Sequence, residues 1–178
     1  GRLELDNKER CGGDDCSGTC WDRIVDGIEG ELYYFITGNE FGHHFEAWGL
    51  NGDTEYSLIY YADDWPGDNP GALIGKAVTD GSGDLVIEGS VELNMNLPCS
   101  PDENAEDTCD YCTNGCNPTD GLCRGAKIWL VPSDQYNEGI NSIIGWSPTD
   151  YWLFETDLIL YFDNVNGGYT IGANSFVE

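Results

Sequence analysis

Positively charged side chains are scarce in this sequence. Only 7 Lys and Arg residues stand against 33 Asp and Glu residues, and the formal net charge is −26 at pH 7. Phosphate recognition needs clustered Lys and Arg side chains, so nucleic acid and anionic membrane surfaces are not expected as partners. A chain with this charge also resists close association with copies of itself unless cations neutralise it.

Long apolar runs and helical periodicity are lacking too. No stretch approaches the roughly 18 apolar residues of a membrane-spanning helix, so no membrane insertion is expected. Aromatic residues nevertheless make up 12% and hydrophobic residues 40% of the 178 residues, which is enough for one folded domain with a core. The chain starts at Gly1 without an initiator Met, from which we expect an exported chain whose leader has been removed.

Recognisable catalytic motifs are also lacking. The sequence has no G-x-S-x-G, and the DGSG segment at Asp80–Gly83 is typical of a turn. The two histidines, His43 and His44, are adjacent, so on a strand they would point to opposite faces and could not easily share a metal ion. The many carboxylates could include a hydrolase pair, but their abundance already follows from the acidic surface. We therefore predict no catalytic residues and no enzymatic activity.

The eight cysteines fall into two groups, one near the N-terminus and one central. They are Cys11, Cys16 and Cys20, and Cys99, Cys109, Cys112, Cys116 and Cys123. The C-x-x-C at 109–112 lacks the following His of haem attachment, the second C-x-x-C of a zinc ribbon and the strand–helix setting of a redox motif. In an exported chain, disulfides are favoured over the zinc alternative. Because both groups are odd, either a bridge joins them or a cysteine of each is free or bonds another subunit.

Short alternating segments rich in aromatic and β-branched residues predict strands along most of the chain. These strands are expected at 2–5, 31–37, 44–48, 56–61, 72–78, 84–93, 126–131, 151–161 and 169–177. Residues 133–141 favour one helical turn or a short helix. The expected fold is all-β, a single antiparallel β-sandwich of about eight strands with a disulfide-knotted loop insertion and an N-terminal arm. The expected domains are the arm at 1–30 and the sandwich at 31–178, with the cysteine-rich insertion at about 99–125.

Four phrases are fairly specific when they occur together. They are WGLNGDTEYSLIYYADDWPG, GALIGKAVTDGSGDLVIEGSVELNMNLP, GAKIWLVPSDQY and GWSPTDYWLFETDLILYFD. Through them, the chain from about Gly30 to Asp163 resembles a domain of uncharacterised secreted and surface proteins of archaea and bacteria. That domain has no assigned activity, so the resemblance implies a location outside the cell or on its surface and no catalytic residues. Its pattern runs almost directly from LP to GAKIWLV, so the cysteine-rich segments look like additions for crosslinking or docking.

Loops rich in Asp and Asn offer the oxygen ligands that Ca²⁺ prefers. The first candidate metal ligands are Asp63, Asp64 and Asp68, within the segment YADDWPGDNPG. None of the acidic loops has the spacing of an EF-hand, and the alternative, in which Asp and Asn only form turns, stays open. Calcium is the one cofactor we expect; haem and nucleotide are not.

These features predict a secreted structural protein that self-assembles into an extracellular filament, sheath or surface layer, stabilised by disulfides and divalent cations. The segment Arg2–Asp6 would complete the sheet of a neighbouring copy by strand addition, with Leu3 and Leu5 as subunit contacts. The alternative is a secreted β-sandwich module that binds carbohydrate or another partner. In that case exposed tryptophans would stack on the ligand, and the candidates are Trp65, Trp146 and Trp152.

Overall fold

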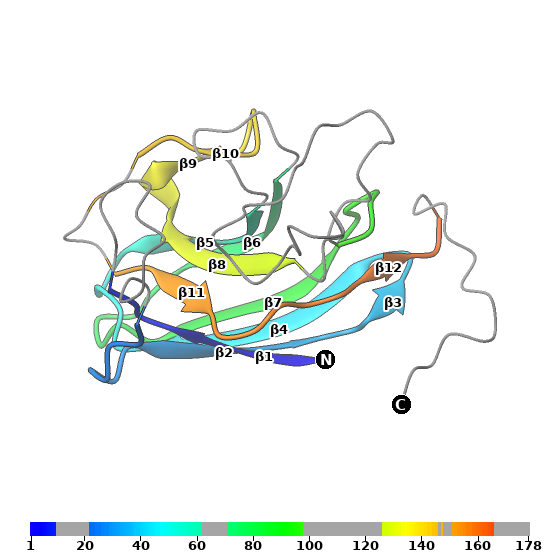
Figure 1. Ribbon diagram of the computed structural model, residues 1–178. Coiled ribbons are helices and arrows are strands. Elements are labelled where there is room, and N and C mark those ends of the chain that lie inside the picture. The colour runs from blue at the N-terminus through cyan, green and yellow to red at the C-terminus, as the bar shows by residue number, and fades with distance from the viewer. Residues whose placement is uncertain (10–21, 62–70, 98–125, 146, 148–150, 166–178) are drawn as a thin grey trace.

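The computed structural model describes residues 1–9, 22–61, 71–97, 126–145, 147 and 151–165. They form an all-β structure with one short 3-10 helix, η1 at Ser133–Gln135 (Figure 1). The strands are β1 (Arg2–Asp6), β2 (Glu29–Tyr34), β3 (Thr37–Gly38), β4 (Phe41–Trp48), β5 (Glu55–Tyr61), β6 (Ala72–Val78), β7 (Leu85–Val91), β8 (Lys127–Pro132), β9 (Tyr136–Asn137), β10 (Ser142–Ile143), β11 (Leu153–Glu155) and β12 (Phe162–Asp163). In this part of the chain, no helix has the length and apolar character needed to cross a membrane.

Eight of these strands form one antiparallel sheet in the order β6-β5-β8-β11-β1-β2-β4-β7. Figure 1 shows that the sheet folds over, so that β5, β6 and β8 lie above β2, β4 and β7. The two outer strands, β6 and β7, come close together. A β-carbon on Gly75 of β6 would lie only 2.5 Å from Cγ2 of Ile87 in β7. The predicted all-β class is therefore confirmed, and the two layers belong to one continuous hydrogen-bonded ladder.

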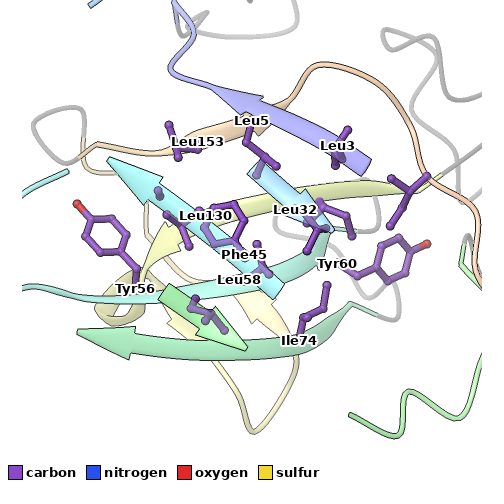
Figure 2. Close-up of a cluster of buried hydrophobic side chains, with 14 of the residues drawn as sticks. Leu3, Leu5, Leu32, Phe45, Tyr56, Leu58, Tyr60, Ile74, Leu130 and Leu153 are labelled. Atoms are coloured by element: carbon purple, nitrogen blue, oxygen red, sulfur yellow. The ribbon is translucent and has the colours of Figure 1, made fainter. Parts of the chain in front are cut away.

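The main core lies between the two layers. Alternation along a strand directs every second side chain inward, and β1 follows it with Leu3 and Leu5 buried. Figure 2 shows these two leucines in one cluster with Leu32, Phe45 and Leu58, which come from β2, β4 and β5. The first strand of the sequence thus contributes directly to the centre of the fold.

A second apolar cluster covers the opposite face of β5, β8 and β11. Trp129 stacks on Tyr61 with 4.0 Å between ring centroids and meets Phe154 edge-on at 4.9 Å. Trp152 is fully buried beside them, and residues of the β9–β10 hairpin pack against the same cluster. Because β8 is buried on both faces, the residues that follow Lys127 in this strand form a continuous apolar run rather than an alternating one.

The turn predicted at Asp80–Gly83 is confirmed between β6 and β7. Asp80 Oδ1 accepts hydrogen bonds from the backbone N–H groups of Ser82, at 2.8 Å, and Asp84, at 3.0 Å, and these bonds lower the pKa of Asp80. Gly83 has φ +87°, and a β-carbon there would lie 2.1 Å from the carbonyl oxygen of Leu50. This position therefore requires glycine both for its conformation and for space.

Several predicted segments differ from the structure. Residues 2–6, expected in an arm, form a strand inside the sheet. The run at 84–93 ends its pairing at Val91, shortly before Asn94 adopts a left-handed conformation with φ 58°. The run at 151–161 forms a continuous strand only at β11, because the chain then bends, and Asp157 Oδ1 accepts the N–H of Leu158 at 2.8 Å. The predicted strand at 169–177 and the cysteine-rich insertion lie outside the described residues.

Candidate functional site

Strand β1 fills a slot between β2 and β11, which we call the β1 slot. It pairs with β2 along all five of its residues and with β11 at two of them. Beyond these ladders, the Gly1 nitrogen donates to the carbonyl oxygen of Tyr34 at 2.6 Å. The N–H and the hydroxyl of Thr156 both donate to the carbonyl oxygen of Glu4 at 2.9 Å. The first strand in the sequence therefore completes the middle of the sheet rather than an edge.

Leu3 and Leu5 are the apolar anchors of this strand. Their exposed fractions are 3% and 0%, so each contributes about 1.5–3 kcal/mol of hydrophobic stabilisation relative to an exposed side chain. The structure places both predicted subunit contacts inside the core of their own chain. Their contact with a neighbouring copy stays a prediction.

Basic side chains gather around the β1 slot although they are rare in the chain. Arg23 lies 3.0 Å from Asp6 and 3.0 Å from Glu29, so it bridges the end of β1 to the start of β2. Burial raises the pKa of Asp6, and Arg23 opposes that rise. Sequence reasoning did not find this cluster. The available signal was the position of the basic residues, because four of the seven lie within the first 23 residues.

Glu155 is the most perturbed carboxyl group at the slot. Its residue is half-buried, and its Oε2 atom is buried without a hydrogen-bond partner among the described residues. Burial raises the pKa of Glu155 to about 7, and the nearby ammonium groups of Lys127 and Lys8 oppose that rise. Lys8 also donates to the carbonyl oxygen of Glu155. This contact fastens the segment after β1 to the end of β11.

The exposed face of the sheet carries a row of carboxylates beside the slot. Glu4, Glu31 and Glu46 are direct neighbours across β1, β2 and β4, and like charges in such positions repel one another. Arg2 pairs with Glu4 at 2.9 Å and with Glu31, and His44 lies 3.0 Å from Glu46. The row attracts cations, but the described residues include no group of three or more His, Cys, Asp or Glu that could hold a metal ion.

The two histidines point to opposite faces of β4, as predicted. His44 Nδ1 lies 3.2 Å from Glu88 and its other ring nitrogen contacts Glu46, and these hydrogen bonds raise the pKa of His44, the one with Glu46 most. His43 packs against Phe41 with 6.0 Å between ring centroids, and burial lowers its pKa. The pair therefore forms no common metal site.

The remaining predicted site residues fall into two classes. Trp152 is fully buried, so it cannot stack on a sugar, and this weakens the carbohydrate-binding alternative. The others lie outside the described residues: Asp63, Asp64, Asp68, Trp65, Trp146 and the cysteines Cys11, Cys16, Cys20, Cys99, Cys109, Cys112, Cys116 and Cys123. The calcium site and the disulfides therefore stay predictions.

Comparison with known proteins found no family model, no curated protein and no solved structure that matches this chain. The resemblance to secreted and surface proteins thus stays a prediction.

Proposed function

We propose that this protein is a secreted structural protein whose copies assemble into an extracellular filament, sheath or surface layer. The observation that supports it most is the position of β1, which is the first strand in the sequence yet lies in the middle of the sheet. A strand in such a position can be supplied by its own chain or by a neighbouring copy. In this proposal, the two layers of the folded sheet form the sandwich body, and the cysteine-rich segments add crosslinks.

The charge of the chain sets a condition on this assembly. Copies that each carry a net charge of −26 repel one another, and the row formed by Glu4, Glu31 and Glu46 concentrates part of that charge on an exposed face. Divalent cations lower the repulsion more effectively than simple screening because they can bind carboxylates of two subunits at once. The proposal therefore includes cation-dependent cohesion, with the loop at Asp63, Asp64 and Asp68 as one candidate calcium site.

A pelleting assay tests the proposal. Purified protein is incubated with CaCl₂ or with NaCl at matched ionic strength, and sedimented protein is measured after centrifugation. We expect Ca²⁺ to drive the protein into the pellet and NaCl to leave it in solution. Equal pelleting in both salts would show that cations act by general screening of charge and not by bridging carboxylates of two subunits. Protein that stays in solution under every condition would contradict the structural role.

A further inference from the structure

The β1 slot has to be occupied for the sheet to remain intact. Withdrawing β1 would leave β2 and β11 without their shared partner and would expose to water the space that Leu3 and Leu5 fill in the core. Unpaired backbone groups beside an apolar cavity are strongly unfavourable. A strand of matching sequence must therefore lie in this slot whenever the protein is folded.

The slot is selective for the sequence of this strand. The occupant must place apolar side chains at the positions of Leu3 and Leu5, and shifting it by one residue would turn both outward. Its first residue must have a charge complementary to Glu31, which Arg2 contacts. Its last residue must have a charge complementary to Arg23, which lies 3.0 Å from Asp6. A second copy of the same chain carries a segment that meets all of these requirements.

The unit that would be exchanged is longer than β1 itself. Residues 1–9 would move together, because Asn7 and Glu9 continue the pairing with 22–28 beyond the end of β1. An exchanged strand makes the same contacts as before, which is why this route to assembly costs little.

We infer that the β1 slot is the interface between copies of this chain, in which the slot of one copy takes residues 2–6 of the next. This inference rests on the proposed structural role and names its site and its partner. It also changes the expectation drawn from the sequence, because the donated strand enters between two strands instead of extending an edge. Each copy gives one strand and receives one, and an exchange that does not close on itself builds an open chain of subunits.

Photocrosslinking between isotopically light and heavy chains tests whether the strand is exchanged. Tyr33, which is exposed and lies opposite Arg2, is replaced by benzoylphenylalanine, so that light-induced crosslinks join β2 to the strand in the slot. Isotopically light and heavy chains are unfolded, mixed in equal amounts, refolded under oxidising conditions and allowed to assemble. The same replacement at Val86, exposed and opposite Glu46, is the control, because β7 and β4 belong to one chain in every case.

Exchange predicts that about half of the β2–β1 crosslinks join a light and a heavy chain, since each slot draws its strand at random. The Val86 control should give crosslinks within one isotope only. If filaments form but all β2–β1 crosslinks stay within one isotope, exchange is wrong and the structural role stands. Mixed crosslinks in small closed oligomers would support exchange and contradict the proposed filament. Crosslinks within one isotope and no assembly would contradict both.

A chain-terminating variant gives a second readout. Leu5→Asp leaves the slot intact but spoils the strand that the copy donates, so a minor fraction of this variant should shorten wild-type assemblies several-fold. The control is Glu92→Gln, a change at an exposed side chain outside the slot and outside the carboxylate row, which should leave the length unchanged. Assemblies of normal length in the presence of Leu5→Asp would contradict exchange.

Discussion

At the residue scale, the carboxyl group of Glu155 makes stability depend on pH. Its pKa is about 7 in the folded protein, compared with an ordinary value of 4.5, so the folded state holds this proton better than the unfolded state. The contribution of this group to the free energy of unfolding is therefore highest below the ordinary pKa, falls as the pH rises from about 4.5 to 7, and levels off above that range. The protonated form suits a carboxyl group whose Oε2 atom is buried.

Glu155→Gln tests this dependence because glutamine resembles the protonated carboxyl group. We expect the variant to raise the free energy of unfolding by about 1–3 kcal/mol at pH 8 and to change it little at pH 4. Urea unfolding across this pH range is the measurement. Glu92→Gln, at an exposed carboxylate, is the control and should keep the wild-type slope. An unchanged slope in Glu155→Gln would show that this group does not cause the effect.

The two histidines give a second prediction at this scale. NMR titration should show the pKa of His44 above the ordinary 6.5 and the pKa of His43 below it. Glu88→Gln should lower the pKa of His44, because it removes one of the two carboxylates that contact the ring, and should leave His43 unchanged. Two histidines that titrate together near 6.5 would contradict the opposite orientations described for β4.

At the scale of elements, the turn between β6 and β7 fixes how two strands of the folded sheet are joined. Gly83→Ala should lower the free energy of unfolding by about 2 kcal/mol or more, because φ is +87° and the new methyl group would meet the carbonyl of Leu50. Gly81→Ala is a matched control in the same turn, where a β-carbon meets nothing within 4 Å. Thermal or urea unfolding of both variants checks this, and equal stabilities would contradict the described turn.

The sequence predicted those elements that are specified by residues close together in the chain. Apolar and polar residues alternate along Arg2–Leu5, which indicates a strand, and turn-forming residues at Asp80–Gly83 indicate a tight turn. Both elements could be identified without knowing the strands next to them. The position of β1 could not be predicted in this way, because its neighbour β11 lies about 150 residues away and Leu5 pairs with Glu155 only once the sheet has formed. For the same reason, the Lys8 contact with Glu155 was not foreseen.

At the scale of the whole molecule, the sheet and the charge act in opposite directions on assembly. In the proposed assembly, a central slot that accepts a strand of the chain's own sequence would favour association, whereas a net charge of −26 opposes it. We propose that divalent cations shift this balance towards association, and that disulfides from the cysteine-rich segments then make it hard to reverse. Under this proposal, self-assembly of the protein depends on divalent cations.

Negative-stain electron microscopy of native material, with and without a calcium chelator, tests that claim most directly. We predict regular filaments or sheets that fray when the chelator removes divalent cations. Filaments that resist the chelator would support the structural role and would indicate that strand exchange and disulfides hold the subunits together. Discrete small particles under both conditions would contradict the proposed function.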